Sequence, residues 1–163
     1  MSEIRPEPLP ELLGRLCEAS EALLALAIPR CPACELLPAT LAAVARSRPR
    51  RAVGIAILAS PADWAARERL LWPRGIRVSR ASVPALTILR DGRAVARRDG
   101  SAPARDLDRW LEEFLGPADV PIVEQPTAEE RAALARTGAR RAQHHMARRG
   151  GGAPGGAAEH PGL

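Results

Sequence analysis

Cys31-Pro32-Ala33-Cys34 holds two of the three cysteines of this chain, and the segments around it can be interpreted from it. It stands where an apolar run, residues 22–28, gives way to a segment with helical character. The local order is therefore a strand, a turn that carries two thiols, and a helix. Two intervening residues let the sulfur atoms meet across one helical turn, and this spacing beside a strand and a helix is typical of dithiol redox motifs. Pro32 suits the first helical position, where a missing amide costs nothing.

A second signal lies about fifty residues further along the chain, in Ser82-Val83-Pro84, a short apolar strand and the pair Asp91-Gly92. Asp-Gly between two strand-like runs is the strongest short-range indication of a hairpin. Together, the dithiol and this segment resemble the thioredoxin family over roughly residues 20–116. The resemblance implies an α/β, thioredoxin-like fold with a mixed central sheet flanked by helices, here with a C-terminal extension.

The resemblance also implies roles for individual residues. In thioredoxin-like proteins a cis-proline loop faces the dithiol, which assigns the cis bond to Val83-Pro84. Val83 would pair its backbone with the substrate, and Pro84 would pack against the two sulfur atoms. Arg30, directly before the first cysteine, joins Val83 and Pro84 as a predicted substrate-binding residue.

The two cysteines are predicted to be the catalytic residues. Thiol-disulfide exchange needs an attacking thiolate and a second thiol that resolves the mixed disulfide. Cys31 is expected at a helix N-terminus, where unpaired amides favour the anion and lower a thiol pKa from its free value of about 8.5. Cys34, one turn further and less exposed, would resolve. Arg30 and Glu35 flank the pair and shift the thiolate equilibrium in opposite directions.

The motif departs from the family pattern in two ways. Thioredoxins proper carry Trp-Cys-Gly-Pro-Cys, whereas here the proline is moved forward, as in glutaredoxins and some disulfide oxidases. The glutathione-binding pattern of glutaredoxins is not evident, because Asp91-Gly92 opens a thioredoxin-style hairpin instead. The buried aspartate of many thioredoxins has no counterpart in residues 22–28, which contain no acid. Substrate and direction of electron flow stay open.

Periodicity and capping residues predict the remaining elements. Helices are expected at residues 10–19, after the dithiol with a bend at Pro38, from a capping box at Ser60, and up to Gly116. Strands are expected at residues 23–28, 52–59, 85–90 and 94–98. We interpret Trp64 and Trp72 as packing residues and Cys17 as a small buried hydrophobe.

Domain organisation follows from composition along the chain. Residues 1–116 are predicted to form the thioredoxin-like domain and residues 117–126 a proline-punctuated linker. Residues 127–149 form a basic segment capable of becoming a helix, and the Gly/Ala/Pro-rich residues 150–163 are expected to be disordered. The 163 residues thus hold one compact domain and a substantial appendage.

Composition excludes several function classes. All 24 basic residues are arginine, so no lysine is available for Schiff-base chemistry. Three cysteines, an odd number, argue against a disulfide-stapled secreted scaffold. The first residues lack a signal-peptide pattern and no apolar run approaches the roughly 20 residues of a membrane span, so we expect a cytoplasmic protein without membrane contact. The net charge of +5 permits nucleic-acid contact, but interleaved aromatic residues are missing, which disfavours it.

No cofactor or metal is expected. Cys31 and Cys34 with His144 and His145 make a formal Cys2His2 set, but adjacent histidines lack a usual zinc spacing. The leading hypothesis is a thiol-disulfide oxidoreductase that acts on protein disulfides, with protein disulfide substrates and an electron-donating reductase or low-molecular-weight thiol as partners. The alternative is a thioredoxin-fold binding or assembly module that engages a partner through its Arg-rich tail, with an incidental or regulatory dithiol.

Overall fold

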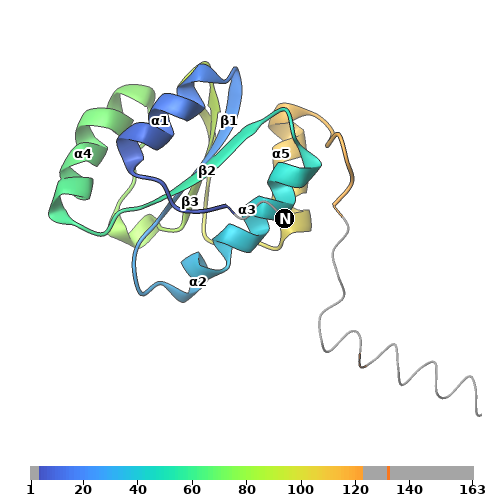
Figure 1. The fold of residues 1–163 in the computed structure, drawn as a ribbon, viewed down its shortest axis with the longest axis horizontal. Helices are drawn as coiled ribbons and strands as arrows, with labels where there is room; N and C mark the ends of the chain where they lie inside the picture. The colour runs from blue at the N-terminus through green and yellow to red at the C-terminus, as the bar shows by residue number, and fades with distance from the viewer. Residues whose placement is uncertain (1–3, 123–131, 133–163) are drawn as a thin grey trace, which may run out of the picture. The chain divides into compact units, whose positions relative to one another are not determined.

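A computed structural model of the chain describes residues 4–122 and residue 132 (Figure 1). Its centre is a four-stranded mixed sheet in the order β2-β1-β3-β4. β1 (Glu21–Ala27) pairs in parallel with β2 (Ala52–Ile57) and antiparallel with β3 (Ala85–Arg90), which in turn pairs antiparallel with β4 (Arg93–Asp99). The α/β fold with a mixed sheet, as predicted, is confirmed.

β1 is the inner strand on which the two halves of the core meet. Its residues from Ala22 to Ala27 are all buried, as expected for a strand covered on both faces. Because side chains alternate along a strand, Leu24 and Leu26 belong to one core cluster, whereas Leu23 and Ala25 belong to the other.

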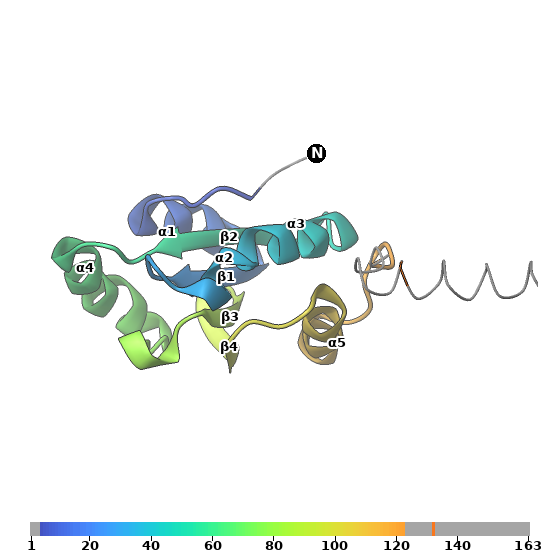
Figure 2. The ribbon, with the colours of Figure 1, turned by 90° about the horizontal axis from the view of Figure 1, so that it is seen from below.

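Helices cover both faces of the sheet (Figure 2). α1 (Leu9–Glu18) and α4 (Pro61–Leu71) lie on one side, and α3 (Leu37–Ser47) and α5 (Ala104–Leu115) on the other. α1 buries the apolar stripe that its sequence predicts, with Leu9, Leu12, Leu13 and Leu16 all in the core. Two short 3-10 turns, η1 (Trp72–Arg74) and η2 (Arg80–Ser82), connect α4 to β3.

Capping and turn residues act as the sequence predicts. Ser60 and Asp63 form the capping box of α4, each side chain accepting a backbone N–H of the other residue. Asp91 and Gly92 have positive φ angles of 51° and 76°, which is the conformation that a two-residue hairpin turn requires. Gly116, with φ 76°, ends α5.

Some element boundaries differ from the prediction. β1 begins at Glu21, two residues early, because Glu21 pairs in register with Arg90 across the sheet. β2 ends at Ile57 and not at residue 59, since the chain must turn into the Ser60 cap.

The chain contacts the domain again after α5, within residues 117–122. In residues 117–122, the first part of the predicted linker, Val120 donates its N–H to the Ser47 carbonyl at 3.0 Å and Asp119 pairs with Arg50 at 3.0 Å. The rest of the linker, the basic segment and the Gly/Ala/Pro-rich tail lie outside the described residues, residue 132 excepted.

Candidate functional site: a dithiol beside a cis-proline loop

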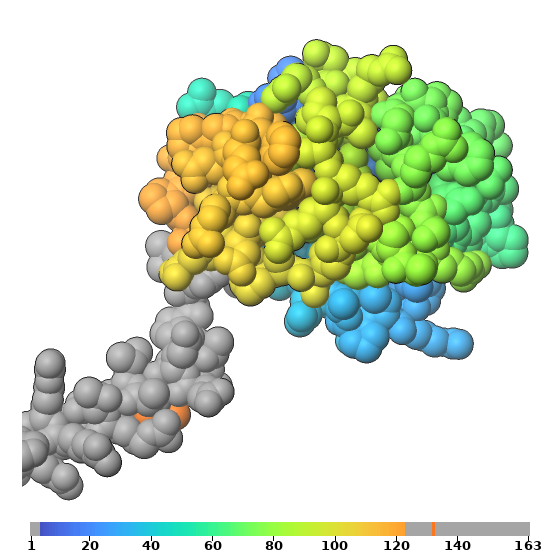
Figure 3. Space-filling view, turned by 180° about the vertical axis from the view of Figure 1, so that it is seen from behind, coloured from blue at the N-terminus to red at the C-terminus, as the bar shows by residue number. Residues whose placement is uncertain are grey.

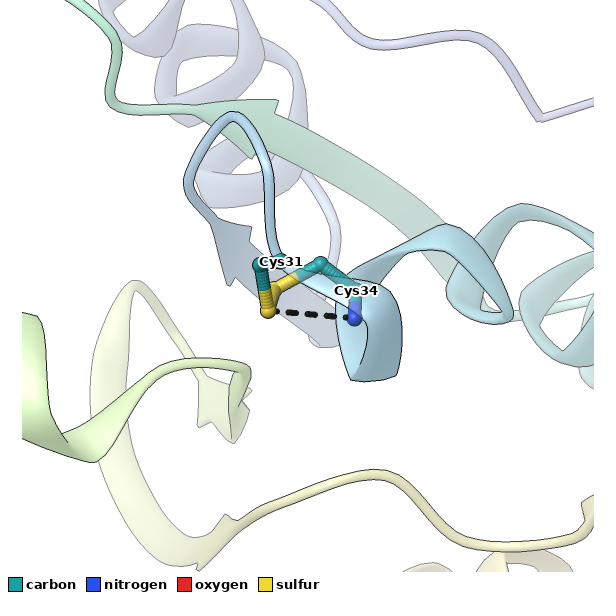
Figure 4. Close-up of a disulfide and its surroundings, with 2 residues drawn as sticks. All are labelled: Cys31 and Cys34. Carbon is teal, nitrogen blue, oxygen red and sulfur yellow. Dashed lines mark hydrogen bonds between the residues drawn. A yellow bond between two sulfur atoms is a disulfide. The ribbon is translucent and has the colours of Figure 1, made fainter.

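The two cysteines of the motif lie just after the carboxyl end of β1 and are joined as a disulfide, with Cα atoms 5.2 Å apart (Figure 4). Cys31 is the residue that caps α2 (Pro32–Glu35), and its Sγ accepts the backbone N–H of Cys34 at 3.2 Å. Pro32 occupies the first turn of α2, where the sequence places it. The geometry therefore puts Cys31 at the N-terminus of the helical segment, as predicted.

A break in the helix separates the dithiol from α3. α2 ends at Glu35, Leu36 stands between the helices, and Pro38 lies in the first turn of α3. The bend expected from Pro38 is therefore present, two residues ahead of the proline. Leu36 is left 63% exposed, which is unusual for a leucine and places an apolar side chain on the surface two residues after Cys34.

Exposure distinguishes the two sulfur-bearing residues. Cys34 is buried, at 6% exposure, and its side chain belongs to the core cluster under α3 and α5. Cys31 is only half-buried, and the neighbouring Arg30 and Pro32 are exposed. Arg30 has a positive φ of 58°, which lets the chain turn sharply between β1 and the dithiol.

The loop that leads into β3 reaches the same end of β1. The Val83–Pro84 peptide bond is cis, as the resemblance implies. β1 and β3 pair with Leu26 opposite Ala85, so continuing this antiparallel register places Val83 opposite Ile28, three residues before Cys31. Ile28 and Val83 also pack against the same core cluster.

A backbone hydrogen bond joins this loop to the residue that follows β4. The Pro84 carbonyl accepts the Gly100 N–H at 2.7 Å, and Pro84 itself is buried. Val83 is in an extended conformation, with φ −95° and ψ 148°.

No carboxylate lies beside the sulfur atoms on β1. The acid nearest in sequence, Glu21, sits at the opposite end of the strand, where it pairs with Arg51 at 2.8 Å and Arg90 at 3.2 Å. The absence of an acid from residues 22–28 therefore means that this strand offers no proton acceptor to Cys34. Within residues 4–122, no group of three or more His, Cys, Asp or Glu could hold a metal ion, while His144 and His145 lie outside the described part.

Two sequence interpretations change in the structure. Cys17 is half-buried, not buried, and its Sγ accepts the Arg74 Nε–H at 3.4 Å. Trp72 is 38% exposed and does not simply pack: the Arg77 guanidinium stacks over its ring at 4.3 Å. Local patterns could not reveal either contact, since each arginine comes from outside the helix that it touches.

None of the helices in the described part of the chain has both the length and the apolar character that a membrane crossing requires.

Comparison with solved structures identifies the fold. Thioredoxin f2 from Chlamydomonas reinhardtii matches 70% of this chain and 98% of its own, with a TM-score of 0.55 and 14% identity. Desulfothioredoxin from Desulfovibrio vulgaris Hildenborough, in its reduced form, matches 70% and 100% with a TM-score of 0.52 and 24% identity. The oxidised thioredoxin from Plasmodium falciparum matches 70% and 98% with a TM-score of 0.53 and 10% identity. No family model matches the sequence, and no curated protein matches it either. The chain has the thioredoxin fold.

Proposed function

We propose that this protein is a thiol-disulfide oxidoreductase that reduces disulfides in other proteins, with Cys31 and Cys34 as catalytic residues. The observation that carries the proposal is the asymmetry of the pair. Cys31 is half-buried at the helix start and its sulfur accepts the Cys34 N–H, whereas Cys34 is enclosed in the core. An attacking thiol must be reached by its partner, and a resolving thiol needs only to reach the first sulfur.

The reaction takes place in two exchanges. In the reduced protein, the Cys31 thiolate attacks one sulfur of the substrate disulfide, a mixed disulfide forms, and the other substrate sulfur leaves as a thiolate that takes up a proton. Cys34 then loses its proton and attacks the Cys31 sulfur, which releases the second substrate thiolate. The substrate disulfide gains two electrons and the protein pair is oxidised to the disulfide. A reductase or a low-molecular-weight thiol returns the pair to the dithiol.

Contacts around the pair favour this direction of attack. The N–H that reaches the Cys31 sulfur at 3.2 Å favours the anionic form of a thiol, since hydrogen bonds to a charged form stabilise it. The exposed Arg30, directly before Cys31, adds a positive charge, and the exposed Glu35, directly after Cys34, opposes its effect. With no acid on the buried part of β1, we propose that water takes the Cys34 proton.

The loop at Val83 would hold the substrate. Its backbone is in an extended conformation, which suits pairing with an extended substrate segment. We assign Val83, Pro84 and Arg30 to substrate binding, with Pro84 packed against the sulfur atoms. The exposed Leu36 offers an apolar contact next to the same pair. The compartment that we expect is the cytoplasm, where glutathione and thioredoxin systems keep thiols reduced.

Reduction of insulin by dithiothreitol, followed as turbidity, tests the proposal. The wild-type protein should accelerate the reaction at catalytic concentrations, and Cys31→Ser should not. Cys17→Ser is the matched control, because it removes the remaining thiol and leaves Cys31 and Cys34 intact; it should retain full activity. If the wild-type protein produces no acceleration over dithiothreitol alone, the protein is not a disulfide reductase. The alternative, a binding module that uses its Arg-rich tail, would then be favoured.

A further inference from the structure

A groove of about 480 Å³ opens between α4 with the segment that follows it and the edge strand β4. It is lined by Arg67, Trp72, Arg77, Val78, Ser79, Ser82 and Arg97. Figure 3 shows the two regions side by side, the green residues that follow α4 meeting the yellow-green residues of β4. We call these seven residues the arginine groove. Three of them are arginines and none is acidic.

Stacking on tryptophan holds the arginines in place. The Arg77 guanidinium lies 4.3 Å from the Trp72 ring centroid, and Arg67 lies 5.0 Å from Trp64 and 5.8 Å from Trp72. Arg80, next to the groove, stacks on Trp64 at 4.7 Å. Arg67 is fixed further, because one of its terminal nitrogens donates to the Val78 carbonyl. Guanidinium groups fixed in this way lose little conformational entropy when they bind an anion.

The positive charge of these arginines is only partly balanced. Arg67 pairs with the exposed Glu68 at 3.0 Å, and Arg97 pairs with Asp99 at 2.7 Å. Among the described residues, neither Arg77 nor Arg80 forms an ion pair, and both are exposed. The four arginines are therefore balanced by only two carboxylates. The guanidinium of Arg77 is available to an anionic partner as a hydrogen-bond donor.

The position of the groove suggests which partner this is. Ser82 lines the groove and directly precedes Val83, whose backbone is proposed to hold the substrate. Arg97 stands opposite Thr87 on β3, two residues beyond Ala85. We infer that the arginine groove binds an acidic segment of the disulfide-bearing substrate protein, a few residues from the cysteine that Cys31 attacks. This inference rests on the proposed function and names its substrate class.

A nucleic acid fits the same groove less well. Binding of single strands depends on aromatic faces on which bases stack. Here guanidinium groups stack on Trp72 and on Trp64, so these rings serve to position arginines. The groove offers charge and forked donors, which suit the carboxylates of a Glu- or Asp-rich peptide.

Two disulfide-linked peptides test the inference. They are identical except that three Glu residues beside the cysteine in one are Gln in the other, and kcat/KM is measured for each at low salt. We expect the acidic peptide to be preferred roughly three- to tenfold, since partly exposed ion pairs contribute little each. Arg77→Glu should abolish the preference, and 0.5 M salt should also reduce it. Arg97→Gln should lower it partly.

Arg109→Glu is the matched control. It makes the same change of charge on α5, on the other side of the sheet, at a side chain that is 73% exposed. It should retain the preference. Equal kcat/KM for both peptides in the wild-type protein would overturn the inference and leave the proposed reductase intact.

Binding without exchange separates the two claims. A fluorescent Glu-rich peptide that lacks cysteine should bind Cys31→Ser as well as the wild-type protein, by anisotropy, and should bind Arg77→Glu several-fold more weakly. Absence of binding to the wild-type protein, or tighter binding of an oligonucleotide of equal charge, would overturn the acidic-peptide assignment. In either case, activity on the neutral peptide would still test whether Cys31 attacks the substrate disulfide.

Discussion

Replacing Gly54 by alanine should destabilise the protein, although glycine is normally the poorer residue in a strand. Gly54 lies in β2 under α1, and a Cβ there would stand 2.7 Å from Arg15 Nη2 and closer still to Leu12 Cδ1. Arg15 is exposed and can move, but Leu12 is fully buried and can move only by displacing the core. Overpacking of this kind costs about 1–3 kcal/mol, and the reduced entropy of the unfolded chain returns about 0.4–1 kcal/mol.

We therefore expect Gly54→Ala to lower the free energy of unfolding by roughly 1–2 kcal/mol. Urea unfolding of the full chain, followed by tryptophan fluorescence, should show a lower midpoint with an unchanged slope. Gly14→Ala is the control: Gly14 is exposed in the middle of α1 with no atom within 4 Å of the added Cβ, so alanine should stabilise by about 0.5–1 kcal/mol. A stabilising Gly54→Ala would refute the close packing of α1 on β2.

Three further predictions concern thiols and charges. In the reduced protein, iodoacetamide should alkylate the half-buried Cys31 well before the buried Cys34, and peptide mapping that finds equal rates would contradict their assigned roles. Hydrogen bonds lower the pKa of Asp63, the largest effect coming from the Ser60 backbone N–H, followed by the Ser60 hydroxyl and the Ala59 N–H. The Asp63 carboxylate therefore stabilises the folded protein above the unfolded pKa of about 3.9, and this contribution is lost as the pH falls through the lower folded pKa. The stability difference between wild type and Asp63→Asn in urea should accordingly close as the pH falls below the unfolded pKa and through the lower folded one; a constant difference would contradict it. Asp108→Ala should cost about 3 kcal/mol in thermal or urea unfolding, because it leaves the Arg48 guanidinium, 3% exposed, without its carboxylate; a loss below about 1 kcal/mol would show that the pair is hydrated.

Local signals allowed much of the site to be predicted. Cys31-Pro32-Ala33-Cys34 specifies a turn, a proline at a first helical position and a dithiol spacing within four residues, so no distant contact is needed to recognise it. Asp91-Gly92 specifies its own turn conformation, and Ser60 with Asp63 its own cap. The cis bond at Val83–Pro84 came from the family resemblance, because an isolated X-Pro bond is cis only in about 5–6% of cases in folded proteins.

The rest of the site depends on which segments the fold brings together. Trp72 and Arg77 lie five residues apart but meet only because η1 turns the chain back, and Arg97 reaches the same groove from β4. Periodicity describes one element at a time, so it assigned the tryptophans to packing. Cys17 shows the same limit, since its Sγ contacts Arg74, which lies beyond α4 in the chain.

Trapping of a mixed disulfide distinguishes the attacking cysteine from the resolving cysteine. Cys34→Ser keeps the proposed attacker and removes the resolver, so it should accumulate a covalent adduct with a peptide disulfide. Intact-mass measurement followed by proteolytic mapping should place one peptide on Cys31, and Cys31→Ser, whose Cys34 is buried, should form none. An adduct on Cys17, or equal trapping by the two variants, would contradict the account in which Cys31 attacks and Cys34 resolves.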